Sequence, residues 1–256
     1  MNHIWIALGG IVFPFIMATL GAALVYCFKG DLSPRGKMVV FGVSAGVMLA
    51  ASIWSLFQPA ITESRNAWGD FASIPILGGF FLGVSLLVLV DCINRRKNSV
   101  GVVIFEKGRA QKLFLSMTLH NIPEGMAVGF AFGAVSATNG FSAYYTALGL
   151  AIGMGIQNFP ESLAMALPLK DVLKSRNKAF FYTLLSSALE PMCAILGYFF
   201  AAYMKIAQPW LLSFAAGAML YIVFDELLPQ CMEDKTGWRT IVVLLGFVLM
   251  TLLELF

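Results

Sequence analysis

Two segments of the chain place a proline, a glutamate and amide side chains inside long apolar runs. One reads His120-Asn121-Ile122-Pro123-Glu124-Gly125 and the other reads Gln157-Asn158-Phe159-Pro160-Glu161-Ser162, so both contain Asn-x-Pro-Glu. A carboxylate at the centre of a membrane helix costs about 2.5–3.5 kcal/mol or more, and a proline there removes a backbone hydrogen bond. Because the chain contains both of these unfavourable features twice, it indicates a polar site inside a membrane.

The spacing in the first segment predicts which side chains share a helix face. His120 and Glu124 are four residues apart and therefore lie on one face. Asn121 lies about 100° round the helix, on the flank of that face. Pro123 cannot donate to the carbonyl of Leu119, so we expect that oxygen to be free to face the site.

The second segment repeats this arrangement with Gln157, Asn158 and Glu161. Two carboxylates, one imidazole and several amide oxygens form a pocket rich in hydrogen-bond acceptors. No lysine or arginine lies in the middle of either apolar run, so a divalent metal is the partner that relieves both the repulsion and the desolvation. Mixed imidazole and carboxylate ligands suit zinc, iron or manganese better than magnesium or calcium.

Other acidic residues also fall within apolar runs. Glu190 directly precedes Pro191, and we expect it to line the site. Asp225 and Glu226 belong to the site, to a pathway, or to a pair with another helix. Asp91 ends its run, where an interfacial cap is the more ordinary role.

The composition predicts the elements that must position these residues. Of 256 residues, 59% are hydrophobic and 12% are charged, whereas soluble domains carry about 25% charged residues. We therefore expect an all-α integral membrane protein, a single transmembrane domain surrounded by lipid and without a nucleic-acid partner. At roughly 20 residues per span, the apolar runs predict eight spans, which are 4–28, 37–57, 74–94, 113–135, 142–168, 179–203, 209–231 and 239–256.

The basic residues predict the orientation of the chain. If the N-terminus is outside, the cytoplasmic connections are 29–37, 95–112, 169–178 and 232–239, and they hold 15 of the 17 lysines and arginines. The outer side then holds only Arg65 and Lys205. Because cytoplasmic connections carry an excess of Lys and Arg, both termini are expected outside, with 95–112 as the longest cytoplasmic connection.

Three functions are compatible with a buried metal or proton site. The first is a transporter of divalent metals. The second is an intramembrane metalloenzyme, but the chain has one histidine within the apolar runs and no His-Glu-x-x-His pattern. The third is a proton-coupled carrier of an organic substrate, with the glutamates as proton relays. The residues favour the first function.

The paired motifs resemble those of the ZIP family of divalent metal transporters, in particular the bacterial GufA-type branch, and the resemblance covers essentially the whole chain. It implies a ZIP-like bundle with a metal site between the fourth and fifth spans. The residues implied to lie in or beside that site are His120, Asn121, Glu124, Gln157, Asn158 and Glu161. Met48, which composition alone assigns to core packing, is implied as a further ligand. Glu190 is implied to touch a second metal position and Glu226 to lie on the exit route.

The resemblance also implies a mechanism. The family imports metal into the cytoplasm, by an elevator-like shift of spans one, four, five and six against the rest, and its members are often homodimers. The cation, Zn²⁺ or a relative such as Fe²⁺, Mn²⁺ or Cd²⁺, is then the transported substrate, without a cofactor, and the location is a bacterial inner membrane. Two features depart from the family. Asn158 stands where some relatives have Asp, which puts double metal occupancy in question, and the connection 95–112 has no histidine.

Overall fold

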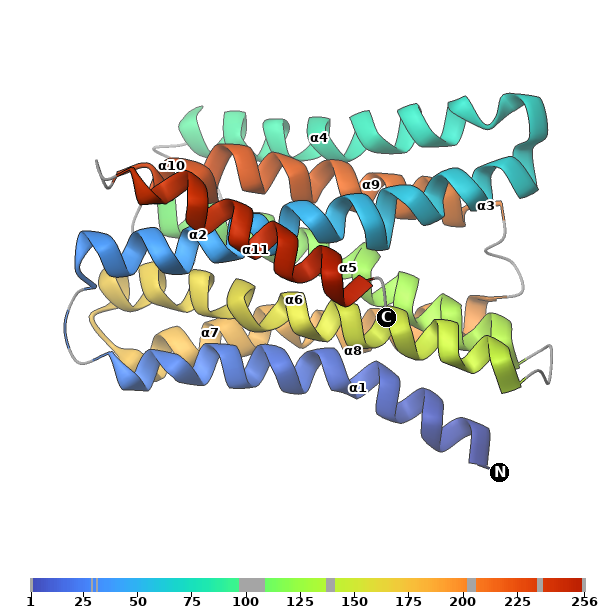
Figure 1. The fold of residues 1–256 in the computed structure, drawn as a ribbon, viewed down its shortest axis with the longest axis horizontal. Helices are drawn as coiled ribbons and strands as arrows, with labels where there is room; N and C mark the ends of the chain where they lie inside the picture. Colours follow the sequence, from blue (N-terminus) through green and yellow to red (C-terminus); the bar gives the residue numbers. More distant parts are fainter. Residues whose placement is uncertain are drawn as a thin grey trace.

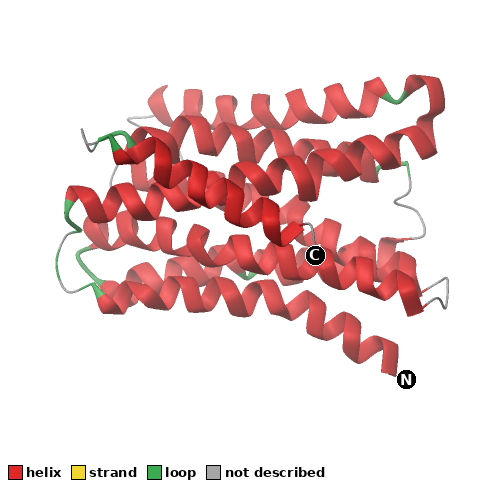
Figure 2. Cartoon of the chain, in the orientation of Figure 1, coloured by secondary structure: helices red, strands yellow, loops and turns green. Residues whose placement is uncertain are grey.

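The computed structural model describes residues 2–28, 30, 32–96, 109–136, 141–201, 206–233 and 237–254. The regular structure of these residues is entirely helical (Figure 2), which confirms the predicted all-α class. The helices run side by side along the longest axis of the molecule, and both ends of the chain lie toward the same side (Figure 1). Most of the predicted connection 95–112 lies outside the described residues.

The described helices match the eight predicted spans. The first four spans are α1 with η1 (Asn2–Ala23, Leu24–Cys27), α2 with η2 (Pro34–Ala51, Ser52–Phe57), α4 (Ser73–Arg96) and α5 (Arg109–Ser136). The last four are α6 (Phe141–Leu173), α7 with α8 (Arg176–Ser187, Leu189–Phe200), α9 with η5 and α10 (Gln208–Ile222, Val223–Leu227, Leu228–Cys231) and α11 (Trp238–Glu254). Five of these segments are long and apolar enough to cross a membrane by length and composition alone. The polar site residues lower the mean hydropathy of α5 and α6.

Two spans differ from the prediction. The second span does not end at residue 57, because η2 continues into α3 (Gln58–Trp68), where Pro59 occupies a tolerated position in the first turn. The sixth span is interrupted at Ala188, between α7 and α8. Pro191 explains this break, since it has no N–H to donate to the carbonyl of Ser187. The break begins a new helix directly before Glu190.

The helices pack as two groups. The first helix group consists of α1, α5, α6, α7 and α8, in which α1 packs on α6 and α5 packs on both α8 and α6. The second helix group consists of α2, α4, α9 and α11 with the short segments that continue them, and its main pairs are α2 with α11 and α4 with α9. In Figure 1, α4 and α9 lie at the top and α1 lies at the bottom. The groups meet where α6 contacts α2 and α5 contacts α9.

Glycines bring the helices within each group into backbone contact. On α5, Gly125, Gly129 and Gly133 face α8, and a Cβ on Gly129 would overlap the carbonyl oxygen of Ala194. The same backbone approach occurs at Gly21 between α1 and α6, at Gly46 and Gly246 between α2 and α11, and at Gly79, Gly83 and Gly217 between α4 and α9. Small residues at this spacing allow close approach of membrane helices. Each of these contacts lies inside one group.

Candidate metal site

An imidazole and two carboxylates meet between α5 and α6. The ligand atoms of His120, Glu124 and Glu161 all lie within 4.8 Å of one another. The imidazole Nε2 of His120 is 2.7 Å from Oε1 of Glu161 and 3.8 Å from Oε2 of Glu124. All three side chains are buried. The two segments that share the Asn-x-Pro-Glu pattern therefore converge on one point.

A backbone carbonyl one turn earlier orients the imidazole. Nδ1 of His120 lies 3.2 Å from the carbonyl oxygen of Ser116. A carbonyl oxygen can only accept, so Nδ1 must carry the hydrogen. Nε2 then points toward the two carboxylates, and a histidine fixed through its other nitrogen is the usual arrangement of a metal ligand.

Amide side chains from α6 hold the surrounding carboxylates. Gln157 Nε2 donates to Glu124 Oε1 at 3.0 Å, and Asn158 Nδ2 donates to Glu190 Oε2 at 2.5 Å. Glu190 reaches this position because α8 lies against α5 at Gly125, where a Cβ would overlap the carbonyl oxygen of Glu190. The predicted residue of the sixth span thus belongs to the same polar network.

The network leaves buried oxygens without a donor. Within the described part of the chain, five oxygens of this network have no hydrogen-bond partner, and they are Glu124 Oε2, Gln157 Oε1, Asn158 Oδ1, Glu161 Oε2 and Glu190 Oε1. Buried polar atoms are normally satisfied, so each exception calls for an explanation. All five are acceptors. A cation, rather than another hydrogen-bond acceptor, is the ligand that would stabilise them.

Two other predicted residues, Asn121 and Met48, belong to α5 and α2, which both contact α6. Asn121 turns its amide away and donates through Nδ2 to the carbonyl oxygen of Ser186, at 3.3 Å. Met48 is fully buried in α2. Ser44, one turn before Met48, donates to the carbonyl oxygen of Pro160 at 2.9 Å. Because α2 and α6 run in opposite directions (Figure 1), Met48 lies at the level of the turn that precedes Pro160.

Glu226 lies apart from the cluster around His120. It is buried in the π-helical segment η5 of the second helix group, and the cluster of ligand atoms among the described residues does not include it. Asp91, in the same group, accepts a hydrogen bond of 3.0 Å from Tyr221. The role of Glu226 on an exit route therefore stays a prediction.

Sequence reasoning missed two serines that position the site. Ser186 provides the carbonyl that binds Asn121, and Ser44 links α2 to α6. Ser186 lies four residues before Glu190 and so continues its face across the break. The four-residue spacing between Ser186 and Glu190 was the feature of the sequence that could have identified Ser186. Nothing local to Ser44 indicates its acceptor, which lies 116 residues away.

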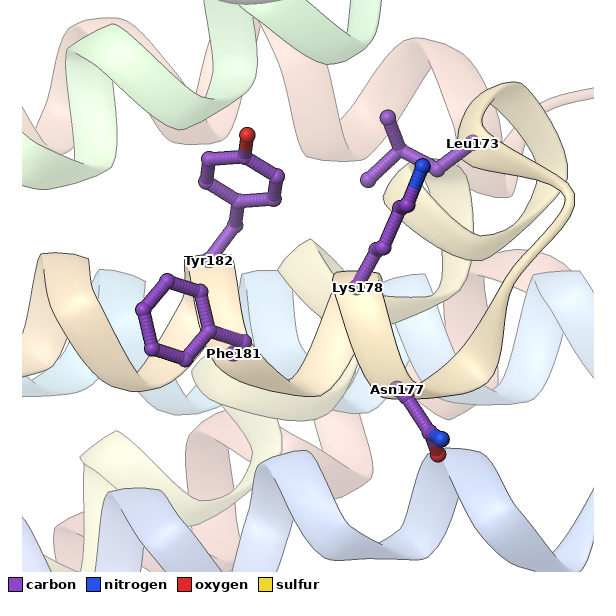
Figure 3. Close-up of a pocket in the computed structure, with 5 residues that line it drawn as sticks. All are labelled: Leu173, Asn177, Lys178, Phe181 and Tyr182. Carbon is purple, nitrogen blue, oxygen red and sulfur yellow. The ribbon is translucent and has the colours of Figure 1, made fainter.

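A separate pocket of about 430 Å³ lies at the junction of α6 and α7. Figure 3 shows its lining residues, which are Leu173, Asn177, Lys178, Phe181 and Tyr182. It contains no carboxylate, and Lys178 gives it a positive charge. The pocket therefore does not suit a cation, and Lys178→Gln is a useful control variant for the metal site.

A helical bundle with a buried, acceptor-rich cluster defines a multi-pass membrane protein that binds cations. The family profile described as "ZIP Zinc transporter" matches residues 97–254. "Zinc transporter ZIP11" of Homo sapiens is 31% identical over 99% of this chain and 97% of its own length. "Zinc transporter GufA" of Myxococcus xanthus is 33% identical over 93% of this chain and 94% of its own. The chain belongs to the ZIP family.

This membership confirms the predicted class of function. The chain is a transmembrane transporter of divalent metal cations, not an enzyme, and the metal is its substrate rather than a cofactor. A third relative is "Zinc transporter ZupT" of Corynebacterium aurimucosum, which is 31% identical over 87% of this chain and 84% of its own length. The metalloenzyme and the proton-coupled organic carrier are set aside.

Proposed function

We propose that this protein imports Zn²⁺ into the cytoplasm by alternating access, through a site formed by His120, Glu124 and Glu161. The observation that carries the proposal is the set of buried acceptor oxygens, without donors, around the Nε2 atom of His120. Fe²⁺, Mn²⁺ and Cd²⁺ are related cations that the same ligands accommodate.

The ligand types fit a cation that must also leave. One imidazole and two carboxylates provide borderline ligands of the kind that zinc prefers. The remaining oxygens come from amides such as Gln157 and Asn158, which carry no net charge. We expect such a shell to bind zinc less tightly than a structural site with thiolates. Glu190, which Asn158 contacts, would form a second position for the cation.

The packing supports movement of the first helix group against the second. Backbone contacts at glycines join helices inside each group, so each group resists internal deformation. Side chains join α2 to α6 across the boundary, through Ser44 with Pro160 and through Lys37 with Asp171, at 3.8 Å. Such polar contacts exchange more readily than interlocked backbones. An elevator-like shift would carry the site between the two sides, and Glu226 would receive the cation on its way out.

Three further features belong to the proposal. The charge distribution supports an orientation with both termini outside. The bacterial inner membrane is the proposed location. A homodimer is the proposed assembly, and native mass spectrometry of the purified protein in lipid would measure it. A monomeric mass under conditions that preserve flux would contradict the dimer.

Zn²⁺ entry into proteoliposomes, followed with an internal dye, tests the function. We expect entry with the wild-type protein and with Lys178→Gln, but not with protein-free vesicles. Entry of Cd²⁺, Mn²⁺ and Fe²⁺, measured in the same vesicles, would establish the preferred cation. A folded protein that admits none of the four cations would overturn the proposal.

Asn158→Asp tests how the second position works. Asn158 Nδ2 donates to Glu190 Oε2, so the variant places two carboxylates against each other and loses a hydrogen bond to a charged group, worth about 1.5–3 kcal/mol. We expect lower thermal stability in chelator, a larger stabilisation by Zn²⁺, and a rise in bound zinc from one to two ions per protein. Asn66→Asp, on α3, is the matched control. Unchanged stability and stoichiometry would contradict this account.

A further inference from the structure

The pocket at the junction of α6 and α7 combines a positive charge with apolar walls. Its volume of about 430 Å³ falls within the range of about 300–1,000 Å³ that is typical of small-molecule sites. In Figure 3, the ammonium of Lys178 and the hydroxyl of Tyr182 project to the same side of α7, with Leu173 beside the ammonium. The ring of Tyr182 packs edge-on against Phe114 of α5, with the ring centroids 6.2 Å apart. This packing fixes one wall of the pocket.

Lys178 differs from the neighbouring basic residues in having no acidic partner. Lys37 and Lys170 share the carboxylate of Asp171, at 3.8 and 3.5 Å, and Lys170 also donates to the carbonyl oxygen of Gly30 at 2.6 Å. In the described part of the chain, no carboxylate forms an ion pair with Lys178. None of the residues that line the pocket is acidic. An anion is therefore the class of ligand that complements the pocket.

The start of α7 adds to the positive potential at the pocket. The helix begins at Arg176, and Ser175 caps it by accepting a hydrogen bond from the backbone N–H of Lys178. The N-terminus of a helix carries a partial positive charge, so anions are stabilised there. Lys178 lies in this first turn. The side chain and the helix end thus favour a ligand of the same sign.

The lining residues are arranged along the direction in which a lipid lies. Phe181 follows Lys178 by three residues, so it lies about 4.5 Å further along α7, on the side of the membrane centre. Its side chain is 59% exposed, which suits contact with an apolar ligand. A free inorganic anion would leave this aromatic surface uncovered, whereas a phospholipid has an anionic phosphate directly above its apolar part.

The position of the pocket in the bundle also favours a lipid. The connections 29–37 and 169–178 hold three and four lysines and arginines, and both lie at the same end of the bundle (Figure 1). Such basic connections face the cytoplasm, where the leaflet carries anionic lipids. Basic pockets between membrane helices on this side bind anionic headgroups.

We propose that this pocket binds the phosphate of an anionic phospholipid from the cytoplasmic leaflet, with Lys178 on the phosphate and Phe181 against the glycerol and the first acyl carbons. Glu190 follows Lys178 by twelve residues, or about 18 Å along the helix axis, so the lipid site is separate from the metal site. Because α6 and α7 belong to the first helix group, the bound lipid would hold the end of that group at the level of the headgroups. The inference goes beyond metal transport and does not depend on it.

Native mass spectrometry of the full chain in detergent tests the charge requirement. Phosphatidylglycerol and phosphatidylcholine with the same acyl chains are titrated in parallel. We expect the wild type to prefer phosphatidylglycerol by about fivefold, the contribution of one basic residue at a membrane surface, and Lys178→Gln to lose this preference. Lys178→Arg should keep it to within about twofold. Arg65→Gln is the matched control, because it removes a positive charge from an exposed residue of α3.

A second variant separates a lipid from a free anion. Phe181→Ala keeps the charge of the pocket but removes its exposed aromatic wall, so we expect it to weaken the binding of phosphatidylglycerol several-fold. Inorganic phosphate should not displace the lipid at equal concentration. Displacement by inorganic phosphate, with Phe181→Ala equal to the wild type, would show that the pocket takes a free anion and would overturn the lipid assignment.

Two other results would also overturn the inference. One is equal affinity of the wild type for phosphatidylglycerol and phosphatidylcholine. The other is the same affinity for phosphatidylglycerol in Lys178→Gln and Arg65→Gln. Since the readout is bound lipid rather than zinc entry, either result would leave the proposed function untouched.

Discussion

Glu161→Ala is expected to reduce Zn²⁺ flux at least about 100-fold, to near the level of protein-free vesicles. Changes that only disturb the orientation of metal ligands already cost 10–100-fold in affinity or activity, and this variant removes a ligand. Glu161 Oε1 lies 2.7 Å from Nε2 of His120, and Glu161 Oε2 has no hydrogen-bond partner among the residues that the structure describes. Flux is measured with the internal dye at matched protein density.

The same variant should remain folded. Glu124 and Glu161 are two buried carboxylates that share one imidazole, and His120 still has Glu124 at 3.8 Å when Glu161 is removed. A second carboxylate beside the first is unfavourable in a membrane, so its removal should leave the thermal stability of the metal-free protein unchanged or higher. Zn²⁺ at 100 times its Kd stabilises a one-site protein by about 2.7 kcal/mol, and this shift should disappear in Glu161→Ala. Glu63→Ala on α3 controls for the substitution itself. Flux within threefold of the wild type would remove Glu161 from the pathway.

The residues that share one face of each site helix could be predicted from the sequence, because the geometry within a helix is fixed. The four-residue spacing of His120 and Glu124 placed both side chains on one stripe, and the structure shows this, with Ser116 one turn before them. The pairing between helices could not be predicted. His120 is nearer to Glu161, on another helix, than to Glu124 on its own, and no periodicity encodes that choice.

Glycines at four-residue spacing in a membrane helix suit either close packing or a surface for sliding. Gly125, Gly129 and Gly133 prove to contact the backbone of α8, whereas Gly149 faces open space. The distinction depends on the facing helix, which local sequence does not specify. The break at Ala188 is different, because the Glu-Pro order at Glu190 and Pro191 already contained its cause.

Gly129→Val is expected to destabilise the protein by about 3 kcal/mol or more. Overpacking a well-packed interior costs about 1–3 kcal/mol and occasionally more. Here a Cβ would overlap the carbonyl oxygen of Ala194, and a backbone atom cannot move aside as a flexible side chain does. Thermal unfolding in detergent, with chelator present, measures the loss. Gly149→Val is the matched control, because no atom of the described residues lies within 4 Å of its Cβ position.

The effect of Gly129→Val on the metal site distinguishes a loss of backbone packing between α5 and α8 from general unfolding. In the wild-type protein, Asn158 donates a hydrogen bond to Glu190. Separation of α5 from α8 would move Glu190 away from Asn158. Gly129→Val should therefore weaken the second cation position while His120, Glu124 and Glu161, on α5 and α6, keep their mutual arrangement. Gly149→Val should change neither stability nor zinc binding by much, since its side chain would enter open space. Equal stability of the two variants would show that contact at Gly129 does not hold the first helix group together.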